Sequence, residues 1–160
     1  MIWSSISHNQ IPFLSSPYSR KRKRKVGIFM KLSRQLYNQL IHFVERELPK
    51  EACGILGGVN DHILSIFALP NESNTNKNFY VRQEHVEIVF NKLAHYEQEV
   101  LAIYHSHPNS NPIPSQSDIQ FHPDSQVKMA IMSYKNGNPQ LKIYRIINGI
   151  YINIPFSIIE

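Results

Sequence analysis

The amino-acid sequence predicts a mixed α/β domain, α+β-like in the order of its elements, with at least one helix packed on a sheet. Two stretches, residues 32–48 and 83–99, carry apolar residues at the spacing of three and four that is typical of an amphipathic helix. Shorter apolar runs lie between and after them and are bounded by turn residues, as strands are. The expected order is helix, two strands, helix, strand, short helix and three strands.

The first predicted helix has an apolar residue at every fourth position. Ser33 is a candidate N-cap, because its hydroxyl can accept a hydrogen bond from a backbone N–H of the first turn, and Pro49 is a stop signal. The apolar face consists of Leu32, Leu36, Leu40, Val44 and Leu48. The pattern therefore predicts a helix over residues 32–48 that buries one face.

A β-hairpin is predicted after this helix. Residues 51–58 form a short apolar segment with glycines, residues 62–69 form a second segment, and the turn lies at residues 58–60. Glu51 begins the first strand, where a carboxylate is usually solvated. Cys53 is interpreted as a packing residue, because no Cys-His pairing pattern marks it as a nucleophile.

The middle of the chain predicts a loop, a helix and a central strand. Residues 71–78 are a polar loop rich in asparagine, which either lines a groove or only connects two elements. Helical spacing predicts the second helix at residues 83–99, and residues 100–106 form the apolar central strand. Three histidines on the predicted helices are interpreted as surface residues: His42, His85 and His95.

The C-terminal part of the chain predicts three strands joined by turns. Residues 127–134 and 141–147 are apolar, and residues 135–138 carry a hairpin turn signal. Residues 150–159 are expected to form one last strand at an edge of the sheet, because Pro155 cannot donate a ladder hydrogen bond.

Composition and charge limit the possible classes of function. A chain of 160 residues, 42 % hydrophobic and 18 % charged, is typical of one soluble globular domain. No apolar run approaches the roughly 20 residues that a membrane helix needs. The net charge of +5 comes from a basic run at residues 20–25, since residues 30–160 hold 11 Lys and Arg against 12 Asp and Glu. We therefore expect no nucleic-acid partner for the folded part. The single cysteine excludes an internal disulfide and favours a reducing compartment, the cytoplasm.

Residues 1–29 are expected to lie outside the fold, and residues 30–160 to form the domain. The N-terminal stretch contains no acidic residue and no periodic apolar pattern, and it lacks the continuous apolar segment of a secretory signal. Two interpretations stay open. The stretch is either a disordered basic tail, with a polyanion-binding or nuclear-targeting run at residues 21–25, or a mis-assigned start that precedes the true first residue, Met30.

The most informative stretch is residues 104–118, which read Tyr-His-Ser-His-Pro-Asn-Ser-Asn-Pro-Ile-Pro-Ser-Gln-Ser-Asp. His105 and His107 follow an apolar run, and on a strand they point to the same face and can share one metal ion. Two imidazoles, the carboxylate of Asp118 and a position left to water are the composition of a hydrolytic zinc site. Each residue also has an ordinary explanation, the histidines as exposed polar residues and Ser115 with Asp118 as a helix capping box.

The spacing His-x-His-x7-Ser-x2-Asp resembles the JAMM signature of the MPN+ metalloprotease family. A glutamate before a strand that contains Cys-Gly, here Glu51 before residues 53–54, extends the resemblance, as does the wording Ile-Tyr-His-Ser-His-Pro at residues 103–108. The resemblance covers residues 30–160, and no essential motif position is substituted. It implies the MPN/JAMM fold, a curved mixed β-sheet packed by helices, with a cytidine-deaminase-like architecture.

The resemblance also implies the chemistry of the site. One Zn²⁺ per chain would be bound by His105, His107 and Asp118, with Glu51 as the general base and Ser115 as the donor to the oxyanion. The family hydrolyses peptide or isopeptide bonds after the C-terminal Gly-Gly of ubiquitin-like proteins. The compact chain resembles the small stand-alone prokaryotic members, which makes a ubiquitin-like or sulfur-carrier protein the expected partner.

Other classes of function are weighed against this one. An MPN-type domain can be a catalytically idle scaffold for protein interaction, although retention of all five site positions argues against it. A zinc deaminase needs a Pro-Cys-x-x-Cys ligand pair, which a chain with one cysteine lacks. Residues 71–80 and Tyr104 are further candidates to line the cleft. The sequence leaves open the oligomeric state and whether the bond cleaved is a peptide, an isopeptide or a single-residue extension.

Overall fold

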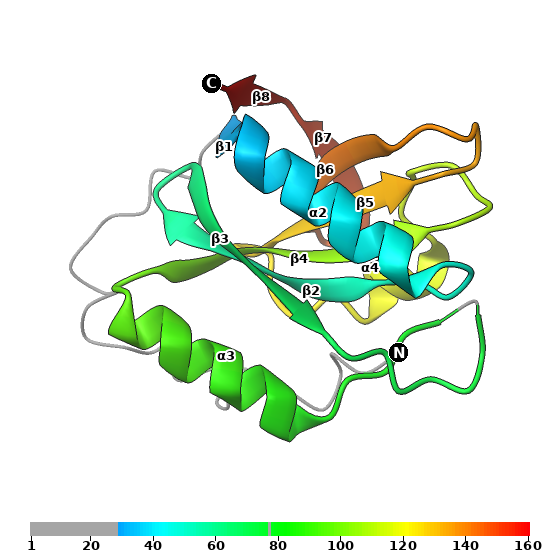
Figure 1. Cartoon of the computed structure of the whole chain (residues 1–160), viewed down its shortest axis with the longest axis horizontal. Coiled ribbons are helices and arrows are strands. Elements are labelled where there is room, and N and C mark those ends of the chain that lie inside the picture. The colour runs from blue at the N-terminus through cyan, green and yellow to red at the C-terminus, as the bar shows by residue number, and fades with distance from the viewer. Residues whose placement is uncertain (1–28, 77) are drawn as a thin grey trace.

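The computed structural model of the chain describes residues 29–76 and 78–160. The elements in chain order are β1 Met30–Ser33, α2 Arg34–Glu47, β2 Cys53–Val59, β3 His62–Leu69, α3 Gln83–His95, β4 Glu99–His107, α4 Gln116–Gln120, β5 Lys128–Ser133, β6 Gln140–Ile147, β7 Ile150–Ile154 and β8 Phe156–Ile159. The strands form one eight-stranded sheet in the order β7-β6-β5-β4-β2-β3-β1-β8 (Figure 1). The sheet is mixed, because β4 pairs with β5, and β1 with both β3 and β8, in parallel, whereas the other pairs are antiparallel.

The sheet is curled, and the chain passes directly from one edge strand to the other near its C-terminus. β7 and β8 stand at opposite ends of the strand order, yet only Pro155 separates them in sequence. The carbonyl of Pro155 accepts a hydrogen bond from the N–H of Met30 at 3.0 Å, and from there β8 pairs with β1. The expectation of one strand over residues 150–159 is therefore wrong. Because proline has no N–H, the ladder with β6 stops there and the chain passes to the other edge.

The first predicted helix starts later than expected, because residues 30–33 form strand β1. Met30 and Leu32 are buried and alternate with partly exposed residues, as in a strand. The partner strand β8 lies at the far end of the chain, so no local sequence pattern indicated this pairing. Ser33 is confirmed as the N-cap, since its hydroxyl accepts from the N–H of Leu36 at 3.2 Å.

The second helix ends earlier than predicted, at His95. The backbone of Glu97 is left-handed, with φ of 53°, and the N–H groups of Glu97 and Gln98 bond to the carbonyls of Ala94 and Leu93. This is the Schellman arrangement that ends many helices, usually with glycine at the left-handed position. A glutamate there gives no stop signal, so the helical pattern ran on to residue 99.

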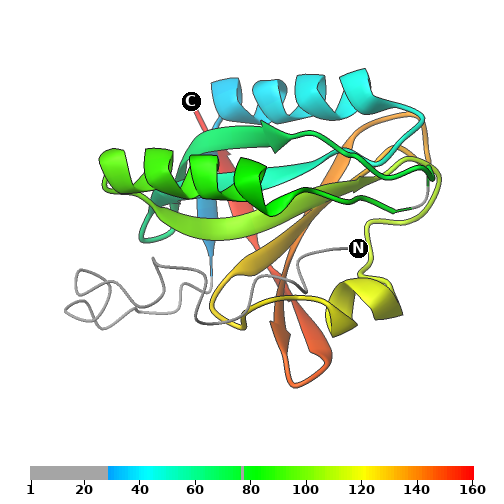
Figure 2. The same cartoon turned by 90° about the horizontal axis from the view of Figure 1, so that it is seen from below.

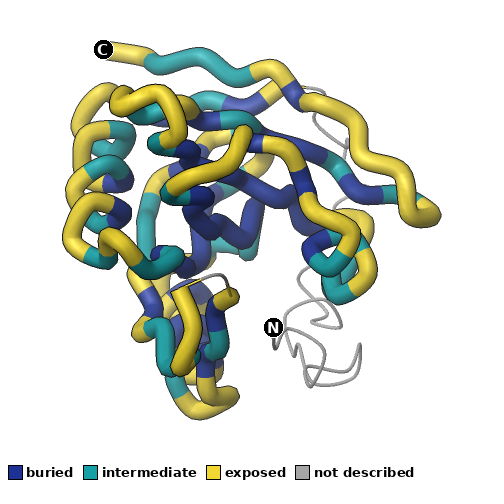
Figure 3. Tube along the Cα trace, turned by 90° about the vertical axis from the view of Figure 1, so that its right-hand side faces the viewer, coloured by how far each residue is buried: buried dark blue, intermediate teal, exposed yellow. Residues whose placement is uncertain are grey.

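The two long helices cover opposite faces of the sheet (Figure 1). Along β4, Ala102 and Tyr104 pack in one buried cluster with residues of α2, whereas Ile103 packs in another with residues of α3. Short helix α4 contacts β5 and β6 through Ile119 and lies apart from both long helices (Figure 2). Buried residues gather along the central strands, between exposed outer surfaces (Figure 3). The alternation on β4 directs His105 and His107 to the α3 side.

Two further predictions concern the whole chain. None of the helices in the described ranges is long and apolar enough to cross a membrane. Of the stretch 1–29, only Phe29 lies within the described residues, so both interpretations of that stretch stay predictions.

Candidate metal centre

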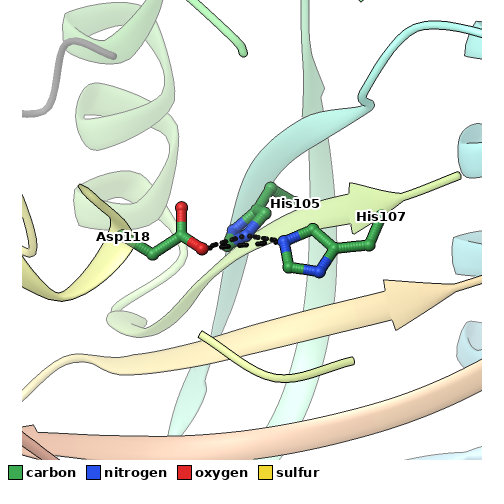
Figure 4. A group of neighbouring side chains, drawn as sticks. All are labelled: His105, His107 and Asp118. Atoms are coloured by element: carbon green, nitrogen blue, oxygen red, sulfur yellow. Dashed lines mark hydrogen bonds and ion pairs between the residues drawn. The ribbon is translucent and has the colours of Figure 1, made fainter. Parts of the chain in front are cut away.

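Three side chains from β4 and α4 meet at one point, as Figure 4 shows. The Nε2 atoms of His105 and His107 lie 3.1 Å apart. Oδ2 of Asp118 lies 3.4 Å from Nε2 of His105 and 3.6 Å from Nε2 of His107. All three residues are at most 9 % exposed, so they are not the exposed polar residues of the ordinary explanation.

The size of this triangle fits a zinc ion. Ligand atoms placed tetrahedrally about 2.0–2.1 Å from Zn²⁺ are about 3.3–3.4 Å from one another. The three measured separations, 3.1, 3.4 and 3.6 Å, scatter around that edge length. Two imidazole nitrogens and one carboxylate oxygen are also the donor set that zinc accepts in hydrolytic sites. The residues present therefore fit the metal.

Hydrogen bonds behind the triangle orient two of the candidate ligands. Nδ1 of His107 lies 2.8 Å from the carbonyl oxygen of Asn111, which can only accept, so Nδ1 carries the proton and Nε2 presents its lone pair to the centre. Oδ2 of Asp118 accepts from the N–H of Ser115 at 2.7 Å. The ring of His105 stacks on Phe79, with centroids 5.4 Å apart. The triangle is thus held from several sides.

The electrostatics of the triangle match a site built for a cation. Burial alone would raise the pKa of Asp118, but hydrogen bonds with His105 and His107 outweigh it and hold that pKa far below its usual range. Burial alone would lower the pKa of His107, but hydrogen bonds with Asp118 and the Asn111 carbonyl raise it above its ordinary value. An ionised, buried carboxylate beside an imidazole of raised pKa, that of His107, is an arrangement that a metal cation also satisfies.

Glu51 lies outside the triangle but shares its cleft. A cleft of about 360 Å³ is lined by Glu51, His107, Ser115 and Asp118, among others. The strand expected to begin at Glu51 begins at Cys53, so Glu51 stands just before it. Burial raises the pKa of Glu51 to about 7, while the charge of His107 opposes the shift.

The pairing of β2 with β4 brings Glu51 to the site. Cys53 is opposite His105 in the ladder, and the backbone of Ala52 exchanges hydrogen bonds with Ser106. Ala52 donates to the Ser106 hydroxyl at 2.8 Å and accepts from the Ser106 N–H at 2.9 Å. Glu51 therefore lies next to β4, the strand that carries His105, although more than 50 residues separate Glu51 from His105 in the sequence.

Ser115 confirms the predicted capping box. Its hydroxyl accepts from the N–H of Asp118 at 3.1 Å, while its own N–H donates to the carboxylate of Asp118. The hydroxyl also lies 3.0 Å from that of Ser117. Since Ser115 lines the cleft, the capping box places one hydroxyl and one candidate metal ligand side by side.

Two loops form the walls of the cleft. We call residues 108–115 the metal loop and residues 71–76 and 78–81 the asparagine loop. The lining residues from these loops are Pro108, Asn109, Ser110 and Ser115 on one side and Asn76, Asn78 and Phe79 on the other. The predicted asparagine-rich loop therefore lines a cleft rather than only connecting two elements.

Two residues considered from sequence lie elsewhere. Tyr104 is 1 % exposed and packs in the cluster on the α2 side of the sheet, so it does not line the cleft. Strand alternation explains the error, because Tyr104 precedes His105 and points the opposite way. Cys53 is a buried free thiol in the α3-side cluster, and burial raises its pKa, as a packing residue requires.

Sequence reasoning missed the residues that support the walls. Asn71, Ser133 and Tyr144 each bond to backbone groups of a cleft loop. An asparagine after a strand, a serine at a strand end and a tyrosine in a strand have no pattern that distinguishes them. Only the fold places their partners within reach.

Comparison with known proteins places the chain in a family. Residues 33–146 match the family described as prokaryotic homologs of the JAB domain, which is more than half of the chain. The chain belongs to this family. The resemblance to JAMM/MPN+ proteins is thereby confirmed.

Curated relatives of this JAB-domain protein include peptidases. CysO-cysteine peptidases of Mycobacterium bovis and Mycobacterium tuberculosis are 23 % identical over 141 residues, which is 86 % of this chain and 97 % of theirs. Membership of the family and these relatives support a JAB-domain peptidase.

Solved structures of similar fold confirm the predicted fold class. A protein from Desulfitobacterium hafniense superposes with a TM-score of 0.74 at 21 % identity, covering 82 % of this chain and 93 % of the other. A JAB1/MPN domain protein from Archaeoglobus fulgidus gives 0.56 at 21 % identity, covering 82 % and 100 %. A structure described as a JAMM metalloprotease-like zinc site in the proteasome and signalosome gives 0.50 at 18 % identity, covering 81 % and 98 %.

Proposed function

We propose that this JAB-domain protein is a zinc-dependent peptidase or isopeptidase that cleaves after the C-terminal Gly-Gly of a ubiquitin-like or sulfur-carrier protein. One observation carries the proposal. The side chains of His105, His107 and Asp118 converge at the spacing of zinc ligands, and Glu51 lines the same cleft. A scaffold for protein interaction needs no such combination.

A zinc ion held by His105, His107 and Asp118 supplies Lewis acidity, which makes water nucleophilic near neutral pH and polarises the carbonyl group of the substrate. Asn111 keeps the proton of His107 on Nδ1, away from the ligand position. The N–H of Ser115 keeps Oδ2 of Asp118 turned towards the two histidines. These contacts hold the ligands in place before substrate arrives.

Glu51 is the general base of the proposed reaction. Its carboxylate accepts the proton of the attacking water and then delivers it to the nitrogen of the leaving amine. A base works best when its pKa lies near the operating pH, and burial raises the pKa of Glu51 to about 7. That value describes the site without metal; a zinc ion held by the three ligands would lower it, because a nearby cation favours the ionised carboxylate.

Ser115 is the donor to the oxyanion. Its hydroxyl has one hydrogen and two acceptor positions, and one acceptor position takes the N–H of Asp118. When the Ser117 hydroxyl, 3.0 Å away, donates to the other acceptor position, the hydrogen of Ser115 remains for the oxygen of the substrate carbonyl as negative charge develops on it. The helix cap therefore uses an acceptor position of the Ser115 hydroxyl, whereas the oxyanion role uses its hydrogen.

The substrate class rests on the family and on the cleft. The relatives named CysO-cysteine peptidases support a carrier protein with an adduct at its C-terminus. An extended chain end can lie in a cleft of about 360 Å³ between the two loops. The buried free thiol of Cys53 supports a reducing compartment, and the cytoplasm is the proposed location.

The test is incubation of the zinc-loaded protein with a sulfur-carrier protein extended beyond its Gly-Gly, followed by intact mass measurement. We expect a product that ends at the second glycine, and no product after chelation. Metal analysis should find close to one zinc per chain, lost in the double variant His105→Ala, His107→Ala. Full zinc occupancy without cleavage of any Gly-Gly substrate would favour the idle scaffold instead.

A further inference from the structure

Asn71 uses its whole carboxamide to join the base side of the cleft to the asparagine loop. Its Oδ1 accepts from the N–H of Ser73 at 2.9 Å and from the N–H of Tyr80 at 3.1 Å. Its Nδ2 donates to the carbonyl of Glu51 at 2.7 Å and to that of Asn78 at 3.2 Å. The partners are backbone groups that can only donate or only accept, so the orientation of the amide is unambiguous.

The contact with Glu51 completes the support of the candidate base. The next residue, Ala52, is bonded on both backbone groups to Ser106 of β4. The carbonyl of Glu51 itself is held by Asn71. The backbone that carries the carboxylate is thus fixed from the metal strand and from the asparagine loop.

The other contacts hold the asparagine loop itself, which forms part of the cleft wall. Bonds to the carbonyl of Asn78 and the N–H of Tyr80 enclose Phe79, whose ring stacks on the candidate ligand His105. The N–H of Glu72 also donates to the carbonyl of Tyr80 at 2.8 Å, which closes the neck of the loop. One side chain therefore connects the base, the loop that lines the cleft and the ring against the metal centre.

We propose that Asn71 is a positioning residue, which holds the backbone of Glu51 and the asparagine loop side by side at a set separation at the edge of the cleft. The inference rests on the proposed function for its catalytic consequence, but not for the geometry it predicts. A base displaced by about 1 Å can cost about 100-fold in rate, so the link matters even though Asn71 touches no reacting atom.

The matched variants are Asn71→Asp and Arg82→Gln. Asn71→Asp keeps both acceptor contacts but turns a carboxylate oxygen towards the carbonyls of Glu51 and Asn78, where a donor is needed. Arg82→Gln removes the exposed ion pair with Glu72 at the same neck and leaves the Asn71 contacts intact. The pair separates the link to Glu51 from general support of the loop.

For the zinc-loaded protein we expect Asn71→Asp to keep its zinc and to lower kcat about 10- to 100-fold, and Arg82→Gln to change kcat by less than about threefold. The measurements are metal analysis and steady-state hydrolysis of the Gly-Gly substrate. A kcat of Asn71→Asp within about twofold of the unaltered protein, at equal zinc content, would overturn the proposal.

A second measurement needs no activity. In chelator-treated protein, Asn71→Ala should accelerate amide hydrogen exchange both in residues 72–80 and at residues 52–53, whereas Arg82→Gln should affect only the loop. Acceleration confined to residues 72–80 in Asn71→Ala would contradict the proposed link. If the unaltered protein cleaves no Gly-Gly substrate, the proposed function fails, and the exchange result still decides for or against the role of Asn71.

Discussion

The metal loop and the asparagine loop face each other across the cleft and are supported in different ways. Three consecutive carbonyls of the metal loop accept hydrogen bonds from side chains of the sheet. Ser133 of β5 donates to Ser110, His107 of β4 to Asn111, and Tyr144 of β6 to Pro112. The asparagine loop is held by its own Asn71 and by the ion pair of Glu72 with Arg82.

This difference in support implies a difference in rigidity between the two loops. Side chains on three paired strands cannot shift independently, so the metal loop keeps the candidate ligands in one geometry. The bonds of the asparagine loop lie mostly within the loop, and its tip, residues 74–76 and 78, is exposed, so that local opening of the tip costs little. It follows that the metal loop is preorganised, and that the exposed tip of the asparagine loop is the part able to adjust to a substrate. The following predictions test this contrast, from the largest expected effect to the smallest.

Glu51 lines the same cleft as the two loops, and its replacement has the largest expected effect. Glu51→Gln should keep about one zinc per chain but lower kcat about 10²- to 10⁴-fold, because the amide cannot accept the proton of water. Metal analysis and turnover of the Gly-Gly substrate measure both quantities. Undiminished turnover would show that Glu51 is not the general base.

Replacement of Ser115 tests the last residue of the metal loop. Ser115→Ala should retain zinc, because the backbone N–H that orients Asp118 remains, yet lower kcat about 10²- to 10³-fold by loss of the oxyanion donor. Loss of the cap should also lower the free energy of unfolding by about 1 kcal/mol.

The matched variant Ser115→Thr keeps a hydroxyl that can cap and donate. It should stay much closer to the unaltered protein in both kcat and denaturant midpoint. If alanine and threonine variants lose activity equally, the hydroxyl is not the group that matters.

Replacement of Tyr144 tests whether the sheet holds the metal loop in place before zinc binds. Tyr144→Phe keeps the ring in its buried cluster but frees the carbonyl of Pro112, which should weaken zinc affinity about tenfold. Competition with a chromophoric chelator measures that affinity. Tyr151→Phe is the control, since the ring of Tyr151 packs against that of Tyr144 with centroids 5.5 Å apart. Equal zinc affinities for both variants would show that this anchor does not support the ligands.

The smallest expected effect is the pH dependence of stability through Glu51. The pKa of Glu51 is about 7 in the folded protein against 4.5 for the unperturbed group, so the folded state binds the extra proton between these values. Stability from this group is complete below pH 4.5 and is lost as pH rises through about 7, when a charged carboxylate must stay buried.

Denaturation of chelator-treated protein at pH 5 and pH 8 measures this contribution. Glu51→Gln should gain about 1–2 kcal/mol on the unaltered protein between the two pH values, a figure reduced for the partial exposure of the carboxyl group. Other titrating groups are common to both proteins and cancel. A difference that does not change with pH would mean that Glu51 is not buried as described.

The features that could be predicted from the sequence are those whose residues lie close together in it. His105, His107, Ser115 and Asp118 lie within 14 residues, so strand alternation and a capping box relate them locally. The amphipathic helices and the hairpin of β2 with β3 are also local, and the structure bears them out. The start of the first helix was predicted wrongly because the partner is remote: β1 pairs with β8 at the other end of the chain.

Glu51 and Asn71 show what local patterns cannot supply. Glu51 looks like a solvated carboxylate in its own surroundings, and only its resemblance to a family motif suggested a role. Residues 71–80 were candidates to line the cleft, but nothing singled out Asn71 as a support, because its partners Glu51, Asn78 and Tyr80 come within reach only in the fold. Hydrogen bonds to distant backbone groups leave no spacing in the sequence.

The sequence by itself therefore determined the fold class, the donor set for a metal and the family resemblance, because these depend on residue types at short separations. Only the tertiary structure decided the size of the ligand triangle, the burial of Glu51 and the unequal support of the two walls. The reason is physical: distances and pKa values depend on which strands pair and what they bury, and the curled sheet sets both.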